Sequence, residues 1–255
     1  MLVIVPLGLT LLPTRTTSTR WWFAFAVPGV VSLWLPRGAV SIALASIYLA
    51  GTLCLIAPAL RHFLQHKVIR PREIALYTAL ATPSIAALAL VAERSSYELF
   101  GFRLTVLSLT VAHFHFAGFA AALIAYLVSD RPGTTTTAAA ISVPLGTAIV
   151  LLGFFLGDPV ELAGAAVLTA GMWLVGWNLW RRSHQADRTT ATLLIVAASV
   201  LVVTMLLAMS WALGHVAGTP YLPLEWMVAT HGLANAVGFG LCGMLAWRRV
   251  RKGIA

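Results

Sequence analysis

The sequence predicts an all-α protein, a polytopic transmembrane helical bundle of about eight spans. Three observations favour this fold class. Hydrophobic residues make up 60% of the 255 residues and charged residues only 10%, whereas a soluble domain carries about 25% charged residues. The mean hydropathy is +0.89. The apolar residues also fall into runs that are long enough to cross a bilayer as helices.

The runs divide the chain into an N-terminal segment and eight spans, which we expect to form a single integral membrane domain over residues 1–255. The opening apolar stretch is too short to span and contains Pro6, so we interpret residues 1–20 as an interfacial or re-entrant segment. The spans are expected at about residues 21–36, 39–60, 74–92, 104–128, 138–156, 162–180, 189–213 and 226–247.

Local signals support several of these elements. The first span is short and begins with Trp21 and Trp22, which suit a membrane interface. Pro83 predicts a kink in the third span. The fourth span, 104–128, carries no Lys, Arg, Asp or Glu. Before the sixth span, Asp158 and Glu161 predict a capping box with Asp158 as the N-cap.

Basic residues indicate how the spans are oriented. With loop 61–73 in the cytoplasm and the sides alternating, segments 14–20, 61–73, 129–137, 181–188 and 248–255 all lie inside. Those segments hold 14 of the 17 Lys and Arg residues. Because basic residues favour the cytoplasmic side, we expect both termini to be cytoplasmic. This distribution also explains the net charge of +9 without a nucleic-acid partner.

Polar residues within two spans are the main functional signal, because ionisable groups in a span are costly unless they serve a purpose. His113 lies nine residues from the outer end of the fourth span, and Asn235 lies nine residues from the outer start of the eighth. Both are therefore roughly 14 Å deep. His231 lies four residues from Asn235, on the same helical face. His115 points about 160° away from His113.

Two interpretations of these groups are open. Single polar residues often join helices and contribute about 0.6–2 kcal/mol. For His115 alone, this structural role and a functional role are equally open. For His113, His231 and Asn235 together we favour a functional pocket near mid-membrane, open to the outer leaflet. Glu93 and Glu225 lie near its mouth. Glu225 is either a proton donor or a favourable charge at a helix N-terminus. Glu93 is either a proton donor or a charge that ends the third span.

The candidate site therefore contains catalytic and binding residues. Imidazole can give or take a proton near neutral pH, and an amide can stabilise a developing oxyanion. The candidate catalytic residues are His113, His231, Asn235, Glu93 and Glu225. The candidate substrate-binding residues are His115, Phe116, Thr230, Phe239 and Trp226. We expect no metal and no cofactor.

Two motifs together resemble a known family. They are HFHFAGF at residues 113–119 and THGLANAVGF at residues 230–239, and the opening VPLGL adds to them. This pattern is similar to the YndJ-like family of bacterial integral membrane proteins. The resemblance implies a helical membrane fold and location in the bacterial cytoplasmic membrane. Members are commonly labelled transporters, but the family supplies no catalytic residues to carry over.

A second, local resemblance concerns VAHFHF at residues 111–116. It is similar to the haem-ligating helix of haem–copper oxidase subunit I, where alternate histidines serve two haems. The chain lacks that family's His-x-x-x-Tyr motif and its adjacent histidine pair. We therefore interpret this match as coincidental and keep haem binding as the weakest alternative.

Two functions remain in competition. One is an integral membrane enzyme that performs acid–base chemistry on a lipophilic small molecule, of the isomerase or cyclase type and possibly terpenoid-like. The alternative is a small-molecule transporter or permease, with the same histidines along its path. We favour the enzyme because the polar residues form a single cluster and the chain is small. No internal repeat is visible, so the support that an inverted repeat would give a transporter is missing.

Overall fold

The computed structural model describes residues 1–12, 19–66 and 69–253. Within these ranges every regular element is a helix, which confirms the all-α fold class. In chain order the helices are α1 Ile4–Leu9, α2 Arg20–Trp34, α3 Ala39–His66, α4 Pro71–Arg94, η1 Leu99–Gly101, α5 Leu104–His113, η2 Phe114–Ala120, α6 Ala121–Val128, α7 Thr134–Leu156, α8 Asp158–Ser183, α9 Arg188–Ala217, α10 Leu224–Met227, η3 Val228–Gly232, η4 Ala234–Leu241 and α11 Cys242–Arg251.

The described part of the chain contains seven helices that are long and apolar enough to cross a membrane. They correspond to seven of the eight expected spans, and the segment Leu104–Val128 has the bounds expected from the sequence. The remaining expected span, 21–36, is helix α2, which has 15 residues. At about 1.5 Å per residue, α2 is roughly 22 Å long, shorter than the roughly 30 Å hydrocarbon core.

The chain divides into two compact units. The first comprises Met1–Ile69 and Leu76–Ala120, and the second comprises Arg70–Ala75 and Ala121–Ala255. The boundary falls inside the apolar segment 104–128, between η2 and α6. The expectation of a single integral domain stays a prediction.

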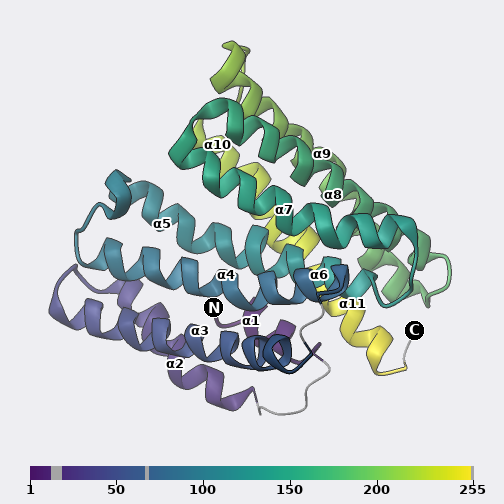
Figure 1. Cartoon of the computed structure of the whole chain (residues 1–255), viewed down its shortest axis with the longest axis horizontal. Coiled ribbons are helices and arrows are strands. Elements are labelled where there is room, and N and C mark those ends of the chain that lie inside the picture. The colour runs from purple at the N-terminus through teal and green to yellow at the C-terminus, as the bar shows by residue number, and fades with distance from the viewer. Residues whose placement is uncertain (13–18, 67–68, 254–255) are drawn as a thin grey trace. The chain divides into compact units, whose positions relative to one another are not determined.

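Close helix packing organises the first unit. Helices α2 and α3 lie side by side (Figure 1), and Gly29 of α2 abuts the ring of Tyr48 on α3 so closely that a Cβ atom would overlap it. Small residues permit this approach in membrane proteins. Helix α1 packs against η2, and its Val5 is fully buried. Part of the expected segment 1–20, residues 13–18, lies outside the described ranges.

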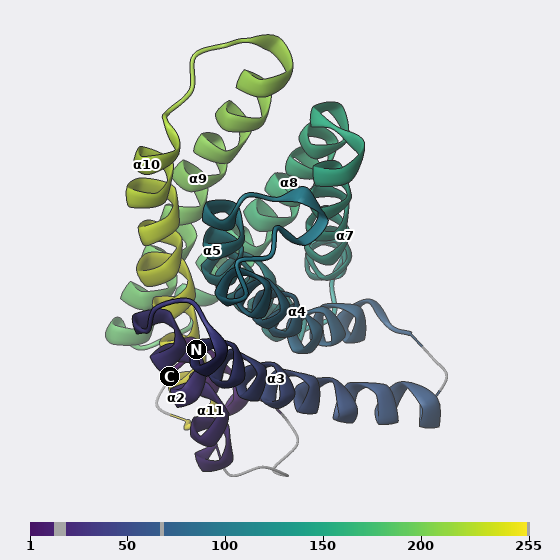
Figure 2. The same ribbon diagram turned by 90° about the vertical axis from the view of Figure 1, so that its left-hand side faces the viewer.

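Glycines also set the packing of the second unit. Helices α7 and α8 form an antiparallel pair in which Gly146 abuts the backbone of Leu168, and Gly164 abuts that of Val150. Helix α9 packs against α8 and also against η3, η4 and α11. Figure 2 shows α9 beside the span that begins with α10, joined to it by the loop 218–223 at one end.

The helix ends include one correction to the sequence interpretation. Helix α8 begins at Asp158 with Gly157 as its N-cap, and no side chain caps it. The expected capping box is therefore wrong. Gly157 has a φ of 110°, which favours glycine, so the turn after α7 places the helix start one residue earlier than an Asp158 cap would. Asp158 and Glu161 still lie in the first turn, where negative charge is favourable.

Candidate functional site

Both sequence motifs fold as π-helix. The first motif, 113–119, begins at the last residue of α5 and continues through η2. The second, 230–239, covers the end of η3 and most of η4. A π-helix has i→i+5 hydrogen bonds, is rare, and is frequent at functional sites. Each unit therefore contains one motif whose backbone departs from regular α-helix within a membrane span.

In the second unit, His231 is fixed by a neighbouring helix. Its Nδ1 lies 2.7 Å from the backbone carbonyl oxygen of Thr204 on α9. A carbonyl oxygen can only accept, so Nδ1 carries the hydrogen and donates it. In the neutral imidazole the lone pair is then on Nε2. The backbone of α9 thus selects the tautomer of His231 and leaves Nε2 as the basic atom.

Asn235 and Thr204 complete this polar cluster. The Nδ2 amide of Asn235 lies 3.3 Å from Nε2 of His231, as the four-residue spacing predicted. The Oγ1 hydroxyl of Thr204 lies 2.9 Å from Oδ1 of Asn235 and also 2.9 Å from the backbone oxygen of Val200. Thr204 is buried, whereas His231 and Asn235 are half-buried. The long Asn235–His231 contact leaves Nε2 the least firmly held atom of the cluster.

We call His231, Asn235 and Thr204 the His231 triad: the first two lie on the span that begins at α10, and Thr204 lies on α9. Chemically, this triad joins a lone pair on Nε2 to an amide N–H donor. A base beside a hydrogen-bond donor can remove a proton and stabilise the oxyanion that results. Sequence analysis missed Thr204, since threonines in spans commonly bond their own helix and give no distinct signal.

In the first unit, His115 forms a buried pair with Tyr48. Its Nδ1 lies 2.6 Å from the backbone oxygen of Val111, so Nδ1 again donates and Nε2 accepts. The donor to Nε2 is the hydroxyl of Tyr48 on α3. Both side chains are buried, and their rings stack with centroids 5.9 Å apart. His115 therefore joins α3 to the first motif, which is the helix-joining role that the sequence left open for it.

Further aromatic packing encloses Tyr48. The indole of Trp22 contacts its ring edge-on, with centroids 5.7 Å apart, and Trp22 Nε1 donates to the backbone oxygen of Met1. Both ring nitrogens of His115 are thus engaged inside a packed core. In this arrangement Nε2 of His115 is occupied by Tyr48, so neither a substrate nor a haem iron reaches it without displacing that hydroxyl.

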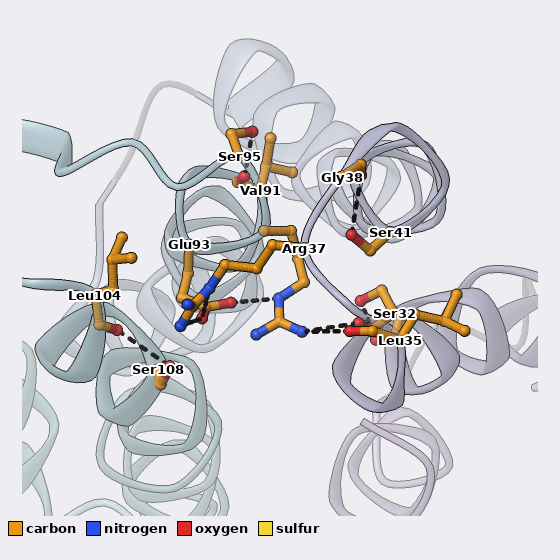
Figure 3. A network of polar contacts seen from close by, with 12 residues as sticks. Ser32, Leu35, Arg37, Gly38, Ser41, Val91, Glu93, Ser95, Leu104 and Ser108 are labelled. Atoms are coloured by element: carbon orange, nitrogen blue, oxygen red, sulfur yellow. Dashed lines mark hydrogen bonds and ion pairs between the residues drawn. The ribbon is translucent and has the colours of Figure 1, made fainter.

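Glu93 belongs to an ion-pair network at the end of α4 (Figure 3). Its carboxylate is buried and pairs with Arg37, whose Nη2 lies 2.8 Å away, and with Arg94. Arg94 also donates to the backbone oxygens of Ser32 and Leu35 at the end of α2. Pro36 has no N–H to offer Ser32 in the helical pattern, so Arg94 supplies the missing donor.

This network gives Glu93 a structural role beside the proposed catalytic one. Two guanidinium groups stabilise the ionised carboxylate, whereas a proton donor must be protonated. The role of Glu93 as the donor stays a prediction. Arg37 and Arg94 were not predicted as its partners, because basic residues near the ends of spans are expected from orientation alone.

The other candidate residues differ in how exposed they are. His113 is exposed and contacts the ring of Phe114 edge-on. Glu225 is exposed in the first turn of α10, and Trp226 is 62% exposed. The hydroxyl of Thr230 donates to the backbone oxygen of Trp226. Phe116 is half-buried and Phe239 buried.

The structure places the candidates in both units. His113, His115, Phe116 and Glu93 belong to the first unit, and the remaining candidates belong to the second. A pocket shared by His113, His231 and Asn235 therefore stays a prediction. Within residues 1–12, 19–66 and 69–253, no three His, Cys, Asp or Glu side chains gather as a metal site.

Together, the apolar helices and the polar clusters inside them define a polytopic helical membrane protein. Comparison with known families agrees with this class. Residues 1–239 match the family described as YndJ-like protein, so the chain belongs to the YndJ-like family. No curated protein and no solved structure matches the chain.

Proposed function

We propose that this protein is an integral membrane enzyme in which His231 performs acid–base chemistry on a lipophilic small molecule. The observation that carries the proposal is the fixed tautomer of His231. With Nδ1 bound to the Thr204 carbonyl, Nε2 presents its lone pair beside the Asn235 amide. A substrate carbonyl that displaces Nε2 from Asn235 would accept the amide hydrogen while Nε2 takes a proton from the adjacent carbon.

This chemistry is of the isomerase or cyclase type. Nε2 removes a proton from one carbon and returns it, as imidazolium, to another, so the double bonds shift and no atom is gained or lost. Asn235 stabilises the oxyanion between the two steps. Glu225, exposed at the start of the same span, remains the candidate for an external proton donor in a cyclase.

The experiment separates catalysis from transport. Purified protein in detergent, without any gradient, is incubated with a membrane lipid extract, and the lipids are compared before and after. A new lipid product that disappears in His231→Ala supports the enzyme. Gradient-dependent uptake of an unchanged solute into proteoliposomes, with no new product, contradicts it.

A transporter is the second candidate, and the π-helical stretches favour it. Transporters often bind substrates where membrane helices are interrupted, and both motifs interrupt a span. In that case His231 and Asn235 would bind the solute, and their variants would lose uptake.

For orientation, we propose the bacterial cytoplasmic membrane with both termini cytoplasmic. Within the second unit, one set of helix ends carries the basic segments 181–188 and 248–252, while the opposite set carries Asp158, Glu161 and Glu225. Cytoplasmic placement of both termini requires α2 to cross the membrane. Reporter fusions after Lys67 and after Thr219 should report opposite sides, and a fusion after Leu12 should report the same side as Lys67.

A further inference from the structure

Helix α8 carries an exposed strip of aromatic and basic side chains. Three tryptophans and a histidine follow one another at intervals of three or four residues, and an arginine lies four residues after the second tryptophan, so all five share one helical face. They are Trp173, Trp177, Trp180, Arg181 and His184. The three indoles are 42%, 49% and 42% exposed, and Arg181 and His184 are exposed as well. We call these five residues the α8 strip.

The rings of the strip contact one another. The centroids of Trp177 and Trp180 are 5.0 Å apart, and those of Trp180 and His184 are 4.7 Å apart. Trp177, Trp180 and His184 therefore form a continuous aromatic surface, and the cation Arg181 lies beside it. Trp173 lies eight residues before Arg181, roughly 12 Å along the helix towards the membrane interior.

A second cation lies at the end of the strip. The guanidinium Nη1 of Arg131, from the loop after α6, donates to the side-chain oxygen of Gln185 at 2.6 Å. Gln185 directly follows His184, so Arg131 is held next to the last turn of α8. Arg131 is exposed, and its bond to a neutral amide leaves its charge uncompensated.

The nearby acids are paired with other residues. Asp130 pairs with Arg182, whose guanidinium also lies over the ring of Trp247. Asp187 pairs with Arg249. Among the ion pairs of the described residues, none holds Arg181. This end of the second unit therefore presents two exposed arginines beside a strip of indoles.

We propose that the α8 strip and Arg131 bind one anionic phospholipid, with its headgroup phosphate between Arg131 and Arg181. Arginine recognises phosphate through charge-assisted hydrogen bonds, and tryptophan prefers the headgroup level of a membrane. Trp177 and Trp180 then pack along the glycerol region and the upper acyl chain.

The strip extends into the apolar part of the span, and this favours a lipid over other anions as the ligand. A free phosphate or a nucleic acid would contact the arginines but not Trp173, which lies within the apolar part of the span. A lipid has both an anionic head and chains that follow the indoles inwards. The site uses no residue of the His231 triad, so it goes beyond the proposed function.

Phosphatidylglycerol and phosphatidylcholine with brominated acyl chains are the probes. They are titrated into purified protein in neutral detergent, and native mass spectrometry counts the bound lipids while tryptophan quenching reports contact. The double variant R131Q/R181Q tests the site. The variant R248Q/R251Q is the matched control, because it removes two exposed charges from the same end of the unit.

Wild type should bind one phosphatidylglycerol saturably and quench, whereas phosphatidylcholine should not compete. R131Q/R181Q should lower the affinity about 30-fold, and R248Q/R251Q should leave it unchanged. W177L/W180L should weaken lipid binding and reduce the quenching with all charges intact. Equal losses in both arginine variants would mean diffuse attraction and overturn the proposal. Displacement by inorganic phosphate or RNA, or equal binding of phosphatidylcholine, would also overturn it.

Discussion

The imidazole of His231 donates its Nδ1 hydrogen to the backbone carbonyl of Thr204, 2.7 Å away on a different helix. A backbone carbonyl is present whatever the side chain at position 204. The tautomer of His231 therefore depends on the packing of α9 against η3, and it should survive changes of the threonine hydroxyl.

The first prediction concerns that tautomer. In Thr204→Val, His231 should keep a protonated Nδ1 and an unprotonated Nε2, while Asn235 loses the hydroxyl that donates to its Oδ1. The loss of this hydrogen bond should cost about 0.5–1.5 kcal/mol of stability. Nitrogen-15 spectra of histidine-labelled protein check the tautomer, with His231→Ala assigning the signal. An Nε2–H form of His231 would contradict the assignment.

The second prediction concerns the buried pair. Tyr48→Phe leaves Nε2 of His115 in a packed core without its donor, which should destabilise the protein by about 1–3 kcal/mol. Thermal unfolding in detergent measures this effect. Tyr97→Phe is the control, because Tyr97 is 62% exposed. Equal melting temperatures for wild type and Tyr48→Phe would show that the pair contributes little.

The third prediction separates the two roles of Glu93. If the ion-pair network with Arg37 and Arg94 is its function, Glu93→Gln should lose about 1.5–3 kcal/mol of stability, the range for hydrogen bonds to charged groups. The exposed Glu98→Gln should lose none. If Glu93 is instead the proton donor, turnover should fall in Glu93→Gln while the unfolding temperature remains that of wild type.

The fourth prediction concerns pH. Asp187 caps α9 by accepting from the backbone N–H groups of Thr189 and Thr190. The hydrogen bond from the Thr190 side chain, these N–H groups and Arg249 hold the pKa of Asp187 below its usual value. Its stabilising effect is therefore present above the unfolded-state pKa, about 3.9, and is lost as the pH falls through the lower folded-state pKa.

Asp187→Asn should accordingly melt at a lower temperature than wild type at pH 7. The difference between the two proteins should shrink as the pH falls below about 4. Melting curves over this pH range provide the measurement. A difference that is constant with pH would mean that the carboxylate charge is not what stabilises α9.

Two features that depend only on local sequence were predicted correctly. The bounds of segment 104–128 follow from its uncharged apolar run, and the contact of His231 with Asn235 follows from their four-residue spacing on a helix. Tyr48 was also within reach of the same reasoning. It lies nine residues from the start of its expected span, at the same estimated depth as His113, but a tyrosine within an apolar run is a weaker signal than a histidine.

Other features depend on tertiary packing. The π-helical turns of η2 and η4 require i→i+5 bonds that no residue pattern specifies. The pairing of Thr204 with Asn235 depends on how α9 packs against the last span. Arg94 donates to the backbone oxygen of Ser32, which lies 62 positions away in the sequence. Pro36 shows that Ser32 lacks its usual helical donor, but the sequence does not show which residue replaces it.

Deuterium transfer tests the central proposal most directly, because every lipid of a mixture is followed at once and the substrate does not have to be identified first. Purified protein is incubated with a membrane lipid extract in D₂O, and the lipids are analysed by mass spectrometry. An acid–base enzyme should place deuterium on carbon in one lipid class. His231→Ala should lower the rate about 10²–10⁴-fold, whereas His215→Ala, which changes a histidine outside the motifs, should not. If no lipid gains deuterium or changes, while proteoliposomes take up an unaltered solute, the enzyme proposal is contradicted.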